Sequence, residues 1–350
     1  MKALGRSWSG RFGHALVLSI ILALLAALLP APLHAETSIK FSLNGKIDGA
    51  AAPFLMAADR GFFRNEGLEV TITPANNSAE AIQRIAANGY DLAVGDINAL
   101  IRYRDQRGDA AVKAAFIVFN KPSHAVLGRK SRGILTPKDL EGKRIATPPT
   151  DDASALWPIF VSNNGIDPTK LTMVSAGAPV REPMLVSGEV DAITGFLYAA
   201  YPDIKDRGMP AEEITVMLMS DYGIDLYGNA ILVSPKFATE NPEAVKAFLR
   251  AFLRGLKETI KQPASAAEIV SKHNLNVSRP ILLEQLQIAI RSNILTPEVK
   301  LNGFGAIDSA RFDKAVEQIG RVIPFKSKPP AATDIFDSSF LPPIGDRKVN

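Results

Sequence analysis

The chain contains no cysteine among its 350 residues. This absence excludes a thiolate nucleophile, a disulfide framework and a cysteine-ligated metal site. It also excludes a lipid-modified cysteine of the kind that tethers exported proteins to a membrane. Stability must therefore come from an apolar core, and a chain of this length is long enough to bury one.

Histidine is also scarce, with four in the chain. Only His124 and His273 follow the N-terminal segment described below. The sequence holds no HExxH, GxSxG or phosphate-binding loop. Hydrolysis would need an activated nucleophile, paired carboxylates or a metal, so we predict no catalytic residue, no metal site and no cofactor. An exported enzyme is the main alternative.

Dense runs of basic residues are absent too. The net charge is +4, but three basic residues lie in the N-terminal segment. The rest of the chain has 37 basic and 36 acidic residues. Binding to nucleic acid usually requires a dense Lys/Arg stretch. We therefore predict no nucleic-acid partner, and we expect a monomer.

The first 35 residues have the pattern of a secretory signal. Lys2, Arg6 and Arg11 form a basic start, residues 15–29 form an apolar run, and Ala35 is a small residue at the expected cleavage site. The apolar run is shorter than the roughly 20 residues of a spanning helix. We expect a cleaved signal peptide at residues 1–35 and export to the periplasm. An uncleaved N-terminal anchor is the alternative.

Strand-like and helix-like segments alternate after the signal, and the alternation starts afresh after about residue 124. Strands separated by helices favour right-handed crossovers and a mainly parallel sheet. From residue 242 to Pro324 the pattern is almost wholly helical, and the tail beyond is expected to be irregular. Strands are predicted at 39–43, 68–73, 91–95, 112–118, 125–128, 143–146, 171–174, 190–194, 214–219 and 229–233.

Two α/β units followed by a helical third predict two lobes of mainly parallel sheets flanked by helices. We expect the chain to cross between the lobes twice, at 119–123 and 221–229. Residues 36–120 plus 229–350 would form lobe 1, with the helical C-terminal part, and residues 121–228 would form lobe 2. Ligands of open parallel sheets bind beyond the carboxyl ends of the strands. This rule predicts a ligand cleft between the lobes.

Five motifs follow one another within residues 38–260: Ala52 to Val70, Asn88 to Asp96, Thr136 to Ile145, Ser187 to Ala192 and Asn241 to Val245. Together they resemble the SsuA/THI5-like (NMT1/THI5-like) family of substrate-binding proteins. The resemblance implies a type II-like periplasmic binding protein. Such a protein captures a small molecule by hinge closure and delivers it to an ABC permease in the inner membrane. Some relatives are pyrimidine-synthesising enzymes with a cysteine-rich motif, which this chain lacks.

The family includes binders of sulfonates, taurine, nitrate-type anions and the thiamine pyrimidine precursor. The pyrimidine binders typically carry an aromatic residue after the first-strand asparagine and a histidine before the Ala-Pro pair. These positions hold Gly45 and Ala51 here, which disfavours a flat heterocycle because it gains most from aromatic stacking. We predict a small organic anion or zwitterion of the sulfonate or taurine type. A pyrimidine or aromatic ligand is one alternative, and a sensing receptor without a role in transport is another.

Candidate ligand-binding residues follow the strand ends that would face the cleft. Lys46 could neutralise an anionic group, and Asp96 could cap a helix, contact the ligand, or do both. The aspartates before the helix at 153–163 would suit an amine, and aromatic residues would supply an apolar wall. The full set is Asn44, Gly45, Lys46, Asp96, Asn120, Thr150, Asp151, Asp152, Phe196, Tyr198, Tyr227 and Asn229.

Overall fold

A computed structural model describes residues 36–107, 111–148 and 152–349. The signal predicted at residues 1–35 lies outside these ranges. From Thr37 onward the chain forms one compact unit. Across the described ranges, every helix is either too short or too polar to cross a membrane.

The described strands form two five-stranded sheets, with orders β2-β1-β3-β10-β4 and β7-β6-β8-β5-β9. β10 in the first sheet and β5 in the second each run antiparallel to both of their neighbours. The remaining pairings are parallel. The strands are β1 (Thr37–Ser42), β2 (Leu68–Thr73), β3 (Leu92–Asp96), β4 (Lys113–Ile117), β5 (His124–Arg129), β6 (Arg144–Thr147), β7 (Thr172–Ser175), β8 (Ala192–Phe196), β9 (Ile214–Leu218) and β10 (Asn229–Val233).

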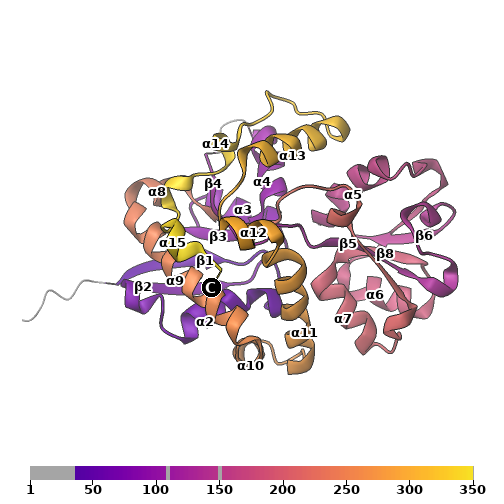
Figure 1. The fold of residues 1–350 in the computed structure, drawn as a ribbon, viewed down its shortest axis with the longest axis horizontal. Helices are drawn as coiled ribbons and strands as arrows, with labels where there is room; N and C mark the ends of the chain where they lie inside the picture. The colour runs from indigo at the N-terminus through magenta and orange to yellow at the C-terminus, as the bar shows by residue number, and fades with distance from the viewer. Residues whose placement is uncertain (1–35, 108–110, 149–151, 350) are drawn as a thin grey trace, which may run out of the picture. The chain divides into compact units, whose positions relative to one another are not determined.

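Helices flank both sheets (Figure 1). α3 and α4 pack on β3, whereas α5, α6 and α7 pack on strands of the second sheet. The helices are α2 (Ala52–Asp59), α3 (Ser78–Ala86), α4 (Ile97–Arg107), α5 (Asp152–Asn163), α6 (Ala178–Ser187), α7 (Leu197–Asp206), α8 (Pro235–Glu240), α9 (Pro242–Lys261), α10 (Pro263–His273), α11 (Arg279–Ala289), α12 (Pro297–Asn302), α13 (Ser309–Val322), α14 (Ala332–Ile335) and α15 (Ile344–Arg347). A short 3-10 helix, η1 (Gly49–Ala51), precedes α2, and a π-helical turn, η8 (Ile290–Ile294), continues α11.

Local signals explain where the elements near the first sheet begin and end. The Asn77 side chain accepts a hydrogen bond from the Glu80 N–H and caps α3, which matches the preference for asparagine at this position. Gly67 has φ 71° and turns the chain into β2, a conformation that costs glycine little. Gly61, with φ 70°, follows the end of α2. The predicted α/β fold is confirmed, but the sheets are mixed and not mainly parallel, because β10 and β5 each pair antiparallel with two neighbours.

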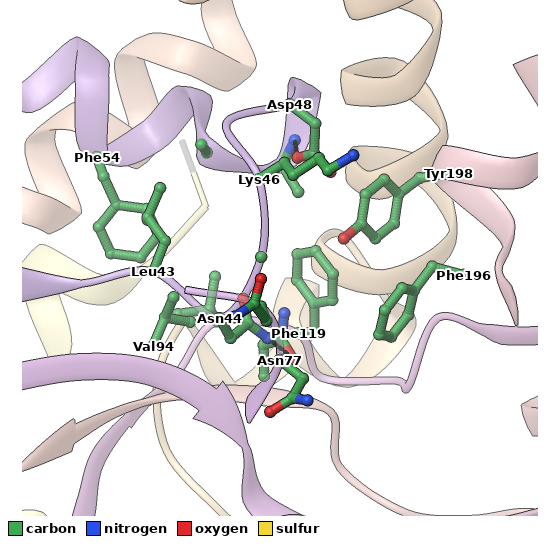
Figure 2. A pocket seen from close by; sticks show the side chains of 16 residues that line it. Leu43, Asn44, Lys46, Asp48, Phe54, Asn77, Val94, Phe119, Phe196 and Tyr198 are labelled. Atoms are coloured by element: carbon green, nitrogen blue, oxygen red, sulfur yellow. Dashed lines mark hydrogen bonds between the residues drawn. The ribbon is translucent and has the colours of Figure 1, made fainter. Parts of the chain in front are cut away.

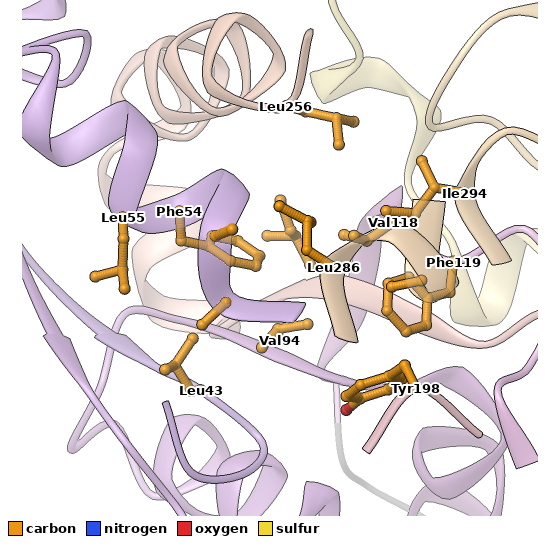
Figure 3. Packing of buried hydrophobic residues seen from close by; sticks show 14 of the residues in the cluster. Leu43, Phe54, Leu55, Val94, Val118, Phe119, Tyr198, Leu256, Leu286 and Ile294 are labelled. Atoms are coloured by element: carbon orange, nitrogen blue, oxygen red, sulfur yellow. The ribbon is translucent and has the colours of Figure 1, made fainter. Parts of the chain in front are cut away.

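The buried core of the first sheet joins α2 to α9. The Phe54 ring centroid lies 4.6 Å from that of Phe252 and 4.8 Å from that of Phe41. Figure 3 shows the same buried cluster extending from Leu55 and Phe54 toward Phe119 and Tyr198. The core therefore continues from the α2 and α9 packing to the edge of the cavity described below.

Gly255 lies where α9 approaches α2 most closely. A Cβ added there would lie 2.5 Å from the Pro53 carbonyl oxygen and 2.7 Å from the Ala57 Cβ. We expect Gly255→Ala to lower the free energy of unfolding by about 1–2 kcal/mol, because overpacking outweighs the roughly 1 kcal/mol gained in helix propensity. Urea unfolding measures this change. The control is Gly345→Ala in α15, where a Cβ meets nothing within 4 Å; equal effects in both variants would contradict the prediction.

Candidate functional site

A cavity of about 230 Å³ opens where the carboxyl ends of β1 and β3 meet the start of β10 and the end of β8. Its lining therefore draws on both sheets. The lining residues are Leu43, Asn44, Gly45, Lys46, Asp48, Ala50, Ala51, Phe54, Asn76, Asn77, Val94, Val118, Phe119, Phe196, Tyr198 and Asn229. Figure 2 shows the aromatic side chains of Phe119, Phe196 and Tyr198 gathered on one side.

Half of the residues predicted as ligand contacts line this cavity. Asn44, Gly45 and Lys46 come from the loop after β1, and Asn229 begins β10. Phe196 ends β8, and Tyr198 lies in the first turn of α7. Their role in ligand binding stays a prediction.

The other predicted contacts lie elsewhere or outside the described residues. Asp96 is buried and caps α4, because its Oδ1 accepts from the N–H groups of Asn98 at 2.9 Å and Ala99 at 3.1 Å. Burial raises the pKa of Asp96, although Arg102 opposes this shift. Asn120 and Tyr227 are buried in a hydrogen-bond network with α12 and α13. Thr150, Asp151 and the side chain of Asp152 lie outside the described part of the chain.

A chain of polar side chains forms one wall of the cavity. Asn44 Nδ2 donates to Ser78 Oγ and to Asn229 Oδ1, both at 3.2 Å. Ser78 Oγ also accepts from the Asp96 N–H at 3.0 Å. Because both of these bonds use the amino group of Asn44, its Oδ1 is the atom that it can offer to a ligand.

Three aromatic rings form another part of the cavity lining. The Phe196 and Tyr198 rings are stacked, with centroids 5.8 Å apart and an interplanar angle of 20°. Phe119 meets Tyr198 edge-on at 6.0 Å. Tyr198 is 7% exposed and Phe119 is 2% exposed, so the rings are held by packing before any ligand binds. A wall of this kind suits a flat apolar or aromatic surface.

Asp48 and Lys46 lie on the same side of the cavity as Tyr198 (Figure 2). Asp48 Oδ1 accepts from the Ala50 N–H at 2.8 Å and caps η1. Burial raises the pKa of Asp48 to about 6, and the hydrogen bonds from the Ala50 and Ala51 backbone oppose that shift. The carboxyl group therefore changes its charge between pH 5 and pH 7.

The sequence reasoning missed several lining residues, including Asp48, Asn76, Asn77 and Phe119. Asn76 and Asn77 follow β2, which pairs in parallel with β1. The carboxyl ends of these strands meet at one edge of the sheet. The rule that selected Asn44 therefore applies equally to this pair. Phe119 lies next to the predicted residue Asn120, in the crossing between β4 and β5.

Residues 49–266 match the family described as "NMT1/THI5 like". The chain belongs to this family. It is 25% identical over 286 residues to the formylaminopyrimidine-binding protein of Halalkalibacterium halodurans, a match that covers 81% of this chain and 84% of that one. It is 26% identical over 303 residues to the riboflavin-binding protein RibY of Chloroflexus aurantiacus, and the match covers 83% of this chain and 82% of that one.

Enzymes also occur among the relatives in this family. The 4-amino-5-hydroxymethyl-2-methylpyrimidine phosphate synthase of Schizosaccharomyces pombe is 23% identical over 234 residues, which cover 64% of this chain and 66% of the enzyme. The structure of the periplasmic aliphatic sulphonate binding protein SsuA from Escherichia coli superposes with a TM-score of 0.66 at 14% identity, covering 89% of this chain and 92% of that one. The fold is therefore that of a periplasmic binding protein, as the motifs predicted.

Proposed function

We propose that the protein is the solute-binding component of an ABC importer and that it captures a small planar aromatic or heteroaromatic compound. The observation that carries this proposal is the wall of three rings, Phe119, Phe196 and Tyr198, in a cavity that polar side chains also line. Stacking on such a wall favours a flat ligand. Two relatives are named for formylaminopyrimidine and riboflavin, and both of these compounds are heteroaromatic.

The aromatic wall makes a pyrimidine ligand compatible with this sequence. Gly45 and Ala51 stand where pyrimidine binders carry ring side chains, so stacking partners are missing at these two positions. In this protein the rings come from the β4–β5 crossing, from the end of β8 and from the first turn of α7. Stacking partners are therefore present, although they are supplied by other segments of the chain.

The size and polarity of the cavity narrow the ligand class further. Its volume of about 230 Å³ is below the roughly 300–1,000 Å³ of pockets for drug-sized ligands. We therefore infer a ligand with one or two rings. The Asn44 Oδ1 atom and the Asp48 carboxylate accept hydrogen bonds, so ring N–H or amino groups on the ligand would be recognised here.

A small organic anion or zwitterion of the sulfonate or taurine type is the second candidate. Lys46 lines the cavity and its side chain is exposed, so its ammonium group can pair with an anionic head group. The fold is shared with a sulphonate binding protein. This candidate predicts that Lys46 contributes more to binding than the rings do.

Ligand capture would proceed by hinge closure between two lobes. We propose residues 36–120 plus 229–350 as lobe 1 and residues 121–228 as lobe 2, and a monomer in the periplasm that docks on a permease. A ligand that touches both lobes stabilises the closed form by its differential affinity for that form. The cavity lining suits this mechanism because it includes residues from both proposed lobes.

The proposal is tested by a thermal-shift screen of the purified protein, followed by calorimetry. One arm contains pyrimidines, other nitrogen heterocycles and aromatic acids, and the other contains alkanesulfonates, taurine and nitrate. A ligand at 100 times its Kd adds about 2.7 kcal/mol to the free energy of unfolding. We expect hits in the aromatic arm. Hits confined to the second arm would favour the anion, and chemical conversion of a compound would favour the enzyme.

An ion pair joins helices of the two proposed lobes. Lys205 Nζ in α7 lies 2.6 Å from Glu284 Oε1 in α11. Because each side chain is about one-third exposed, the pair is worth at most about 1 kcal/mol. We expect Lys205→Ala to weaken ligand binding two- to fivefold, and less at 0.5 M salt. The calorimetric control is Arg207→Ala, since Arg207 pairs with Asp203 on the same helix; equal losses in both variants would contradict a role between the lobes.

A further inference from the structure

A single guanidinium group, that of Arg311 in α13, contacts both chain crossings between the sheets. At the first crossing, Nη1 donates to Asn120 Oδ1 at 3.2 Å and Nη2 donates to the Asn120 carbonyl oxygen at 2.9 Å. At the return crossing, Nη2 donates to the Leu226 carbonyl oxygen and Nε to Asp225 Oδ1, both at 2.8 Å. The remaining N–H of Nη1 donates to Glu298 Oε2 in α12 at 2.7 Å. All five donors of the guanidinium group are thus used.

Tyr227 completes the attachment of Arg311 to the return crossing. The guanidinium carbon lies 4.0 Å from the centre of the Tyr227 ring, a cation–π distance. The Tyr227 hydroxyl donates to Glu298 Oε1 at 3.1 Å and accepts from the Asp308 N–H at 2.8 Å. Arg311 is only 12% exposed in its side chain. Its contacts are therefore largely shielded from competition with water.

The two crossings also lie close to each other at this point. The Gly228 N–H donates to the Phe119 carbonyl oxygen at 2.9 Å, and the Phe119 N–H donates to the Asn229 carbonyl oxygen at 2.9 Å. A Cβ on Gly228 would lie 3.0 Å from both the Phe119 Cβ and the Pro122 Cα. Arg311 therefore spans a pair of segments that already touch, and it fixes them to α12 and α13.

These segments carry two residues of the cavity. Phe119 precedes Asn120 and belongs to the aromatic wall, whereas Asn229 follows Gly228 and accepts the hydrogen bond from Asn44. Displacement of the crossings would therefore change the contact of Phe119 with Tyr198 and the hydrogen bond of Asn229 with Asn44. The contacts of Arg311 end on the backbone of Asn120 and Leu226, so they constrain the path of the chain directly.

We propose that Arg311 is a positioning residue, which clamps both hinge crossings to the C-terminal helices and so holds Phe119 and Asn229 in the geometry that binds ligand. This proposal rests on the proposed function in one respect, the location of the ligand between the lobes. Bending is then confined to the parts of the crossings beyond the clamp, next to β5 and β9. A hinge with fewer accessible conformations loses less entropy when the ligand closes it.

The first test measures the hinge without any ligand. The chain has no cysteine, so Glu212→Cys and Glu240→Cys place one spin label beside each sheet, at positions that are exposed. We expect the distance distribution between the labels to be clearly broader in Arg311→Met than in the labelled parent protein. Arg207→Met serves as the control, because that arginine pairs within α7. An unchanged width in a cooperatively folded Arg311→Met protein would overturn the proposal.

The second test measures the affinity for the strongest compound found in the screen. We expect Arg311→Met to raise the Kd of this compound about tenfold. Arg311→Lys should raise the Kd less, because lysine keeps the positive charge but not the planar set of donors. Tyr227→Phe keeps the ring under the guanidinium group and should raise the Kd two- to threefold. If Arg311→Met does not fold, Tyr227→Phe takes its place in both measurements. Weaker binding with an unchanged distance distribution would contradict positioning through the hinge. If no compound binds, the proposed function fails and the distance measurement still decides the role of Arg311.

Discussion

Phe196→Ala is expected to weaken the binding of a flat heterocycle about 10- to 30-fold. The ring lines the cavity, stacks on Tyr198 and is only half-buried, so its face is available to a ligand. Stacking of a base on an aromatic side chain is worth about 1–3 kcal/mol, or about 5- to 150-fold in Kd, and the expected loss is the middle of this range. Calorimetry with the best compound of the screen measures the loss.

Two further variants separate stacking from general apolar contact. Phe196→Leu keeps most of the apolar area without a ring face, and we expect it to lose nearly as much affinity as the alanine variant. Phe62→Ala removes another half-buried ring, at a position outside the cavity lining, and should leave the affinity within twofold of the parent value. A Phe196→Ala protein that binds its ligand normally would remove the aromatic wall from the site.

Asp48→Asn is expected to raise the free energy of unfolding at pH 8 by about 2 kcal/mol. The asparagine keeps an oxygen that accepts from the Ala50 N–H and remains a good helix cap, but it avoids burying a negative charge. A pKa of about 6 in the folded protein, against an ordinary value near 3.9, corresponds to roughly 3 kcal/mol. Because the side chain is half-buried and still reached by water, we take the smaller figure.

Because the pKa of Asp48 is raised on folding, its effect on the free energy of unfolding depends on pH. Below pH 3.8 the carboxyl is protonated in both the folded and the unfolded chain, so its raised pKa costs nothing. Between pH 3.8 and 6 the folded protein keeps the proton that the unfolded chain loses, and the parent protein loses stability as the pH rises. Above pH 6 the cost is constant. Urea unfolding of the two proteins at pH 3.5 and pH 8 should therefore agree at the lower pH and differ at the higher; a constant difference would contradict a raised pKa.

The charge of Asp48 also distinguishes the two candidate ligand classes. A ligand that presents amino or ring N–H groups should bind more tightly above pH 6, where Asp48 accepts hydrogen bonds as a carboxylate. A sulfonate should instead bind more tightly below pH 6, where the negative charge has been removed. Asp48→Asn should abolish either trend between pH 5 and pH 7, when compared with the parent protein at each pH.

Local sequence signals were sufficient to predict most of the elements. The strands at Leu68–Thr73 and Asn229–Val233 have the predicted bounds, because each is marked by strong periodicity and by turn residues. The tail after Pro324, which was expected to be irregular, contains α14 and α15. Each of these helices has only four residues, too few to show a period of 3.6.

The site was harder to predict because it depends on tertiary pairing. Strand-end position was enough to select Asn44 and Phe196, and both line the cavity. Asn120 and Tyr227 were selected for their place on the two chain crossings, and they bond instead to Arg311, Thr296 and Glu298. Those partners lie about 70 to 190 residues away along the chain, and no local pattern relates them. Phe196 and Tyr198 were predicted as aromatic lining residues, whereas Phe119 was missed because only the fold brings it next to them.

The position of β10 in the first sheet has a consequence for how the protein acquires its structure. β10 lies between β3 and β4, yet it follows them by more than 110 residues, so this sheet stays split until the chain has emerged beyond Val233. The strands of the second sheet, from His124 to Leu218, form one uninterrupted stretch. We therefore expect the second sheet to assemble first, and the first sheet to close only afterwards, through a late, non-local step that sets the overall folding rate.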